Sequence, residues 1–199
     1  MLNQYFNKGV KAPSKPDAWD HLHEHAIGLG GEKLDVADLD GTASYGVIYK
    51  GCPVQVDTVS GERVAHPVKS ALIVAGGTTS APRVSKFNLY KAGDFGFVSG
   101  AAVTVSSVDR SSSEYDVLTL SAACTGATAG AILLAAAASG ADPVQKYSAN
   151  ALISRTDDVL SDRTVSCVFK IDEWVLRARL PYNISDADIV KLAPNIVIK

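Results

Sequence analysis

Three of the four histidines lie close together near the N-terminus, where they could hold a metal ion. The sequence there is His21-Leu22-His23-Glu24-His25. On a helix, His21 and His25 would share one face and could bind zinc together. The zincin pattern His-Glu-x-x-His is not completed, because Ile27 stands where the second histidine is required. No distant third ligand is evident, so we expect no metal and no cofactor, and we interpret these residues as the polar face of a helix.

The rest of the chain lacks a complete catalytic set. Outside the N-terminal segment the only histidine is His66, and no Gly-x-Ser-x-Gly elbow is present. The run 76–79 (Gly-Gly-Thr-Thr) lacks the Lys-Ser/Thr of a phosphate loop and indicates a turn between strands. Adjacent Asp157 and Asp158 point apart on a strand, and Asp186 with Asp188 suits the first turn of a helix. We therefore expect no enzymatic activity.

Length and composition fit one domain with an accessory segment. The chain has 199 residues, 47% of them hydrophobic, with 19 basic and 21 acidic residues. That balance argues against a protein that coats nucleic acid, which needs a surplus of Lys and Arg. The most apolar run, 127–138, is about half of the roughly 20 residues that a membrane span requires. We expect neither a nucleic-acid partner nor a membrane partner.

The three cysteines, Cys52, Cys124 and Cys167, are an odd number at wide spacing. This pattern predicts free thiols in a protein made in a reducing compartment rather than a disulfide framework. The first residues also lack the basic and apolar regions of a signal peptide.

Residues 1–45 differ from the rest and are interpreted as an N-terminal arm. Ser14 is a candidate helix N-cap, followed by Pro16 and Asp17 in the first turn. Helical spacing then places four apolar residues on one face: Trp19, Leu22, Ala26 and Ile27. The short arm cannot bury this stripe alone, so we expect it to dock on a partner or to fold back on its own domain.

Residues 46–199 predict a β-rich domain. The segment 53–57 alternates, Ser60-Gly61 can turn it, and 71–75 is a short apolar strand. A hairpin with a long tip is expected from strands at 103–106 and 115–120. The Ala-rich stretch 122–138 fits helix or strand by period alone, and Ile132-Leu133-Leu134 between glycines favours strand.

The C-terminal quarter predicts two strands, a short helix and a last strand. Val165, Cys167 and Phe169 share one face, and after a turn Trp174, Leu176, Ala178 and Leu180 share another, which we expect to be buried. Ser185 and Asp188 start the helix, Pro194 closes it, and a strand at 196–198 follows. The fold class is mainly β, a small antiparallel sandwich or barrel-like domain.

A series of short motifs follows in order through this domain. The first is Val84-Ser85-Lys86-Phe87-Asn88-Leu89-Tyr90-Lys91-Ala92-Gly93-Asp94-Phe95, and others stand at 108–111, 115–120, 130–134, 146–152, 175–182 and 196–198. In this order they resemble the head fibre proteins of tailed bacteriophages that infect Bacteroides and relatives. The resemblance covers residues 46–199.

This resemblance implies a virion structural protein on the capsid exterior, made in the host bacterial cytoplasm. It also implies that the capsid is the partner on which the apolar stripe Trp19, Leu22, Ala26 and Ile27 would dock. The implied partners are the major capsid protein or other capsid proteins, and we expect a homo-oligomer, with a trimer favoured over a dimer. The same fold would permit a carbohydrate- or host-surface-binding β-module of a phage particle, which exposed aromatic residues would favour. An enzyme such as a glycosidase that uses the Asp pairs is the third alternative.

Overall fold

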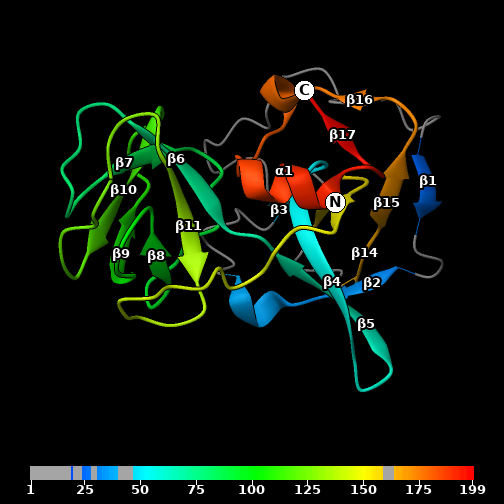
Figure 1. The fold of residues 1–199 in the computed structure, drawn as a ribbon, viewed down its shortest axis with the longest axis horizontal. Helices are drawn as coiled ribbons and strands as arrows, with labels where there is room; N and C mark the ends of the chain where they lie inside the picture. Colours follow the sequence, from blue (N-terminus) through cyan, green and yellow to red (C-terminus); the bar gives the residue numbers. More distant parts are fainter. Residues whose placement is uncertain (1–18, 20–23, 28–30, 40–46, 159–163) are drawn as a thin grey trace.

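The structure, a computed structural model, describes residues 19, 24–27, 31–39, 47–158 and 164–199. Within these residues the chain forms a closed barrel of six strands beside a sheet of seven strands (Figure 1). Most strand pairs are antiparallel, and one α-helix lies near the C-terminus. The expectation of a mainly β fold with a short C-terminal helix is confirmed.

The barrel is formed by residues 70–136. Its strands, in order around the barrel, are β10 (Tyr115–Leu120), β7 (Arg83–Ser85), β6 (Ser70–Val74), β11 (Ile132–Ala136), β8 (Phe95–Phe97) and β9 (Val103–Asp109). Inward-facing residues alternate with outward-facing ones, so the interior fills with apolar side chains such as Val105, Leu118 and Leu133. Closure pairs every strand on both sides, which removes the free edges that an open sheet would expose.

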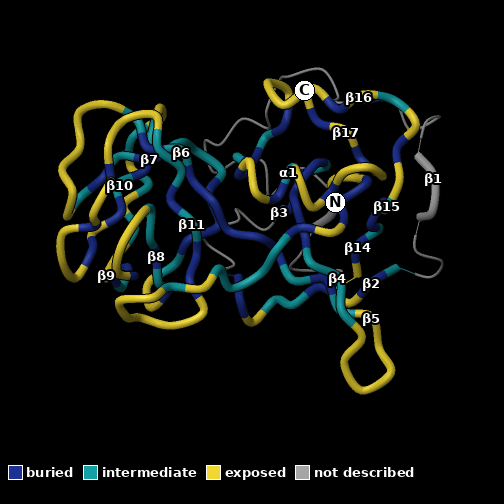
Figure 2. Tube along the Cα trace, viewed as in Figure 1, coloured by how far each residue is buried: buried dark blue, intermediate teal, exposed yellow. Residues whose placement is uncertain are grey.

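The larger sheet has the order β1 (Glu24–Ile27), β15 (Cys167–Ile171), β12 (Ala151–Ile153), β4 (Pro53–Val59), β5 (Glu62–Pro67), β2 (Glu32–Leu34) and β14 (Thr164–Val165). Strand β12, the third in this order, is buried throughout. Ala151 and Ile153 belong to a core on one face, and Leu152 belongs to a second core on the other face. Figure 2 shows the result: exposed stretches gather at the barrel loops and at the turn between β4 and β5.

The barrel is an insertion in the sheet part. The chain leaves the sheet at the end of β5, forms the barrel, and returns to the sheet with β12. A 3-10 helix η2 (Val36–Asp38) and a small pair, β3 (Val47–Ile48) with β13 (Asp157–Asp158), complete the sheet part.

The C-terminal segment closes the second core. It consists of β16 (Trp174–Val175), the 3-10 helix η3 (Arg177–Arg179), the helix α1 (Asp186–Leu192) and β17 (Val197–Ile198), which pairs in parallel with β16. The Ser185 hydroxyl accepts a hydrogen bond from the Asp188 N–H at 3.1 Å, which confirms the expected helix start. No helix formed by the described residues has the length and hydrophobicity that a membrane crossing requires.

Several local predictions are confirmed. Ser60 and Gly61 both take left-handed backbone angles, with φ of 53° and 85°, as the turn of a two-residue hairpin requires. The second predicted hairpin forms between β9 and β10, and the Ala-rich stretch contains strand β11.

The prediction of a helix through residue 27 is wrong where the structure describes the chain. Residues 24–27 form strand β1, which pairs with β15 about the register Glu24↔Ile171. Strand β2 is likewise built into the sheet, between β5 and β14. Residues 1–45 are therefore not a separate arm in their described part, because interstrand hydrogen bonds with distant residues override the local helical period.

The expected burial of Trp174 is also wrong. The Trp174 side chain is 63% exposed, and Leu176, which does lie on the same side, is 38% exposed. The inward residue is Val175, which is 0% exposed, and the strand ends there because η3 begins at Arg177. The buried face of β16 is therefore the opposite of the predicted one, whereas Leu180, which follows η3, is buried as expected.

Two buried tyrosines give a matched test of these cores. The Tyr182 hydroxyl accepts a hydrogen bond from the Tyr49 N–H at 3.1 Å, whereas the Tyr90 hydroxyl, inside the barrel, has no hydrogen-bond partner among the described residues. We expect Tyr182→Phe to lower the free energy of unfolding by about 1–2 kcal/mol, because it leaves a buried N–H without this acceptor. Tyr90→Phe is expected to leave stability unchanged or slightly raised. Urea denaturation of both variants measures the difference, and equal losses would contradict it.

Candidate functional site

Residues from the motifs at 84–95, 108–111 and 115–120 come together around Asp116 in the wall of the barrel. This carboxylate is 0% exposed and accepts hydrogen bonds from Lys86 at 2.6 Å, Asn88 at 2.8 Å and Arg110 at 2.5 Å. Arg110 also donates to the Tyr90 carbonyl at 2.7 Å. We call these four side chains (Lys86, Asn88, Arg110 and Asp116) the Asp116 cluster. It links the segment after β7, strand β10 and the loop between β9 and β10. Its hydrogen bonds and ion pairs therefore stabilise the barrel.

Phe87, between two members of that cluster, joins the barrel to the sheet part. Its backbone takes a left-handed φ of 62°, which is unusual for a bulky side chain. The ring packs edge-on against Tyr49, with 5.4 Å between the ring centroids. The contact with the sheet core offsets the cost of this conformation.

A second ionic cluster lies where the barrel meets the sheet part. Lys69 is almost fully buried and pairs with Asp94 at 2.7 Å and with Asp38 at 3.6 Å. Lys146 also pairs with Asp38. Lys69 stands in the connection into the barrel and Lys146 in the connection out of it, so both connections are fixed to η2. This cluster is the junction clamp: Asp38, Lys69, Asp94 and Lys146.

His66 is positioned by its neighbours without a nucleophile beside it. Its Nδ1 lies 2.9 Å from an Asp35 carboxylate oxygen, and its ring stacks on Tyr147 with 4.5 Å between centroids. No hydrogen bond joins His66 to a hydroxyl or thiol in the described part of the chain. A histidine that activates a serine, threonine or cysteine nucleophile needs such a group within reach.

The three cysteines are free and buried, as the sequence predicted. Burial raises the pKa of the Cys52 thiol and the Cys167 thiol far above the ordinary value, and Glu32 adds to the effect at Cys167. A thiol that stays protonated is a poor nucleophile. These residues act as small core side chains.

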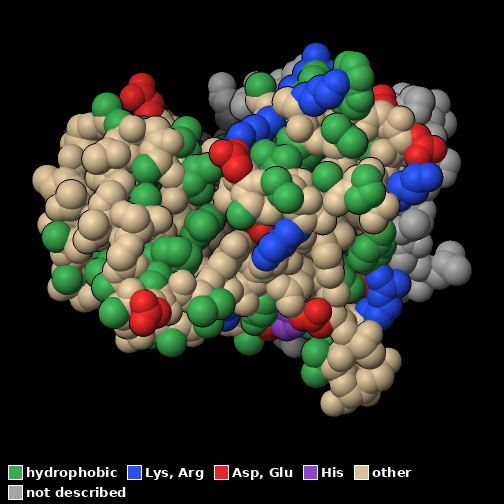
Figure 3. Space-filling view, in the orientation of Figure 1, with side chains coloured by type: hydrophobic (Ala, Val, Ile, Leu, Met, Phe, Trp, Pro, Cys, Tyr) green, Lys and Arg blue, Asp and Glu red, His purple; other side chains and the backbone are tan. Residues whose placement is uncertain are grey.

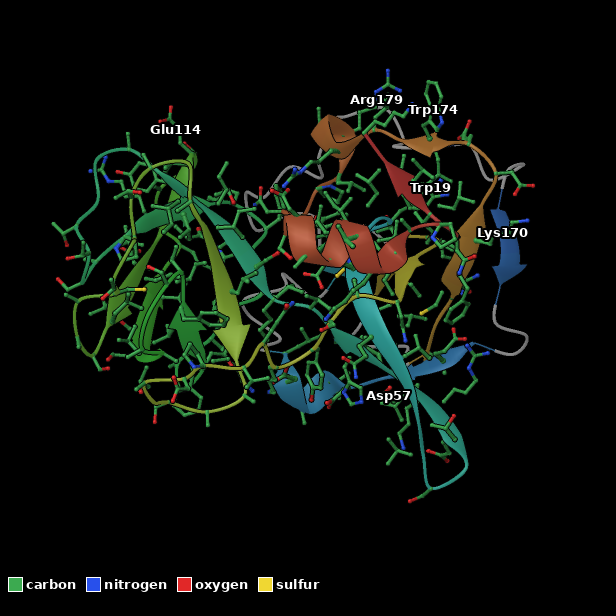
Figure 4. The ribbon with its side chains drawn as sticks, in the orientation of Figure 1. Trp19, Asp57, Glu114, Lys170, Trp174 and Arg179 are labelled. Carbon is green, nitrogen blue, oxygen red and sulfur yellow. The ribbon has the colours of Figure 1, made fainter. Side chains whose placement is uncertain are left out.

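The clearest candidate interaction surface lies on the C-terminal segment. Trp174 is paired with Val197 across β16 and β17, and both point to solvent, at 63% and 37% exposed. The Lys199 ammonium lies 3.0 Å from the centre of the Trp174 ring. Figure 4 shows Trp174 and Arg179 projecting from the same end of the molecule. We call this surface the C-terminal platform: Trp174, Leu176, Arg179, Val197 and Lys199.

A groove adjoins the platform where the C-terminal segment meets the barrel. Its volume is about 330 Å³, and η3 forms one wall while β6 and β11 form the other. Apolar lining comes from Leu72, Ile132 and Leu180. Arg177 lies on the wall shared with the platform and is fixed by Asp186 at 2.8 Å and by the Ile184 carbonyl at 2.7 Å. Figure 3 shows basic and hydrophobic side chains side by side at this end, while the visible face of the barrel carries few charges.

The residues expected to dock on a capsid are not gathered into one exposed stripe. Trp19 is 3% exposed and belongs to the second core with Val175 and Leu180, so it anchors its own domain. Lys50 fixes it by donating to the Trp19 carbonyl at 2.9 Å and by lying over its ring. Ala26 and Ile27 lie in strand β1, and Leu22 lies outside the described residues.

The structure describes only one of the three clustered histidines. His25 lies in strand β1, so the helical spacing that would place it beside His21 is not formed there. His21 and His23 lie outside the described residues. Among the residues that are described, no group of three or more His, Cys, Asp or Glu side chains is arranged to hold a metal ion.

The sequence did not predict the platform residues, because contacts between residues distant in the sequence bring them together. Trp174 was assigned to the core, and Val197 and Lys199 come beside it only through the β16–β17 pairing. A comparison of the chain with protein-family models, with curated proteins and with solved structures finds no match. The fold and the site therefore define a mainly β protein with a barrel inserted in a sheet, without an assembled catalytic set among the described residues.

Proposed function

We propose that this protein is a virion structural protein, a head fibre or capsid decoration protein on the exterior of a tailed-phage capsid, without catalysis. The observation that carries the proposal is the role of the motif that resembles head fibre proteins. Lys86 and Asn88 of the first motif form the Asp116 cluster with residues of two later motifs, and Asp94 of the first motif belongs to the junction clamp. Motif residues that stabilise the fold support a structural role in a virus particle.

The arrangement of titratable groups supports the absence of catalysis. Of the buried carboxylates, Asp38, Asp94 and Asp116 are paired with cations, and Asp188 is held by hydrogen bonds from Gln145 and the Ala149 N–H. His66 has a carboxylate partner but no adjacent nucleophile in the described residues. Catalysis needs a nucleophile, a base and a group that stabilises charge at one place.

The partners in this proposal are the major capsid protein or other capsid proteins, with neither nucleic acid nor a membrane involved. The protein would be made in the host bacterial cytoplasm and assembled as a homo-oligomer, with a trimer favoured over a dimer. Short strands at the ends of an open sheet favour self-association, because their edges gain from being covered. The ends here are β1 and β14.

Capsids assembled without this protein give the direct test. We expect the full chain to bind to their exterior at fixed lattice positions, and a cryo-EM reconstruction of the mixture would show both the site and the symmetry of the attached oligomer. Capsids carrying the protein before and after addition of excess free chain are the saturation control. Absence of the chain from the capsid surface would contradict the proposal.

One observation favours a second candidate function, a carbohydrate- or host-surface-binding module of a phage particle. Trp174 is a large, exposed aromatic side chain, which is a feature of surfaces that recognise ligands. Lys199 weighs against it, because its ammonium covers the ring face on which a sugar would stack. Binding of the chain to host-cell glycans, with loss of binding in Trp174→Ala, would support this second function.

A further inference from the structure

We propose that the C-terminal platform is the attachment surface, and that its occupant is a partner-protein segment in which acidic and aliphatic side chains alternate. The inference rests on the proposed function, because it names the contact through which the protein would attach to a capsid. It also relocates that contact, since Trp19 of the expected docking stripe is part of the protein's own core.

The platform has the apolar strip that such a segment needs. Trp174 and Val197 are register partners, and Leu176 continues the strip along the chain. The opposite face of the same strand pair, Val175 and Ile198, is buried in the second core, so the strip is held on a fixed backbone. Exposed apolar side chains that are contiguous, rather than scattered singly, indicate an interaction site.

The charges beside the strip favour a bound segment that carries carboxylates. Arg177 and Lys170 pair with Asp186 and Asp172, but Arg179 and Lys199 have no acidic partner among the described residues. Two unpaired cations beside an apolar strip are complementary to an acidic segment, and charge-assisted hydrogen bonds to carboxylates are stronger than neutral ones.

The same charges argue against two other occupants. In a two-fold dimer the identical patch faces itself, so the cations Arg179 and Lys199 would face a patch that carries the same two cations. A neutral sugar would have to displace Lys199 from the Trp174 ring and would leave both cations without a counter-charge.

The groove extends the platform in the direction of the barrel. Its wall at η3 is continuous with the strand that carries Trp174. Leu72, Ile132 and Leu180 give it an apolar lining, so an aliphatic side chain of the segment can enter there. Arg177 lines this groove and is paired with Asp186, so the carboxylates of the segment are expected at Arg179 and Lys199.

Tryptophan fluorescence tests the surface without a capsid. Trp174 is exposed and Trp19 is 3% exposed, and these are the two tryptophans of the chain, so quenching by uncharged acrylamide reports mainly Trp174. The probes are short synthetic peptides in which Leu alternates with Asp or with Lys. We expect the Asp-Leu peptide to lower the quenching constant about twofold and the Lys-Leu peptide to leave it unchanged. Trp174→Phe gives the baseline from Trp19.

Charge reversal makes the test sharper. In the variant Arg179→Glu/Lys199→Glu the binding preference should change to the Lys-Leu peptide, because the two charges of the platform have changed sign. The matched control, Lys33→Glu/Val144→Ser, alters an exposed cation and an exposed apolar residue elsewhere, and should keep the preference for Asp-Leu. Equal protection by both peptides, protection by neither, or protection by a neutral oligosaccharide would overturn the inference.

Binding to capsids then separates the two proposals. If the wild-type chain binds capsids, the charge-reversed variant should bind at least about tenfold more weakly, and the control variant should bind as the wild type does. Unchanged capsid binding by the charge-reversed variant would overturn the inference and leave the proposed function standing. A wild-type chain that selects the Asp-Leu peptide but does not bind capsids would overturn the proposed function alone.

Discussion

Replacing Asp116 with alanine is expected to lower the free energy of unfolding by about 3–5 kcal/mol, the usual cost of removing one partner from a buried ion pair. The change leaves Lys86 and Arg110, whose side chains are 18% and 15% exposed, in the barrel wall without their counter-charge. Asn88 also loses an acceptor. The loss would be measured as a shift of the urea denaturation midpoint at unchanged slope.

Two further variants show whether the cause is the uncompensated charge. Asp109→Ala removes an exposed carboxylate from the same hairpin and should change stability little. The triple variant Lys86→Met/Arg110→Met/Asp116→Leu should recover much of the loss, because apolar residues of similar volume often replace a buried ionic cluster without cost. Equal effects of the Asp116 and Asp109 substitutions would contradict the role of the Asp116 cluster.

The second large effect is expected at alkaline pH. Burial raises the pKa of both the Cys52 and the Cys167 thiol in the folded protein, whereas an unfolded thiol ionises near about pH 8.5. Above that pH the unfolded chain binds fewer protons than the folded one, so stability falls as the pH rises. Well above about pH 8.5 each thiol contributes about 1.4 kcal/mol per pH unit, and about half as much at that pH itself, which gives a loss of about 3 kcal/mol for the pair between about pH 8.5 and 10.

Denaturation curves across this range test the origin of the loss. The variant Cys52→Ala/Cys167→Ala starts from a lower stability, but its stability should depend much less on pH up to about pH 10. Above about pH 10 both proteins should lose stability, because burial also raises the pKa of Tyr90 and Tyr182 and unfolded phenols ionise there. An unchanged pH dependence between about pH 8.5 and 10 would contradict the assignment to the thiols.

Local patterns in the sequence predicted the elements whose cause is local. The Ser60-Gly61 hairpin and the Ser185 helix start follow from turn and capping chemistry within a few residues. Strand β1 could not be found in this way, because its partner β15 lies about Lys170, far along the chain. The same holds for barrel closure, which depends on pairings between strands that are distant in sequence.

The candidate site was harder to predict than the fold class. Alternation showed that Trp174 and Val175 face opposite ways, but not which of them meets the core. That depends on the parallel partner β17 and on α1, which fill the inner side. The sequence shows the charged residues of the motifs at 84–95, 108–111 and 115–120. No local pattern, however, shows that Asp116 is buried while Asp109 is exposed.

The junction clamp has a consequence for how this architecture can vary. Lys69 and Lys146 reach the same oxygen of Asp38, so the points at which the chain enters and leaves the barrel lie close together. The outer loops of an insertion with adjacent ends can be lengthened or shortened with little disturbance to the host sheet. Barrel loops such as 111–113 can thus diversify, provided that Phe87 and Asp94 keep their contacts with the sheet part.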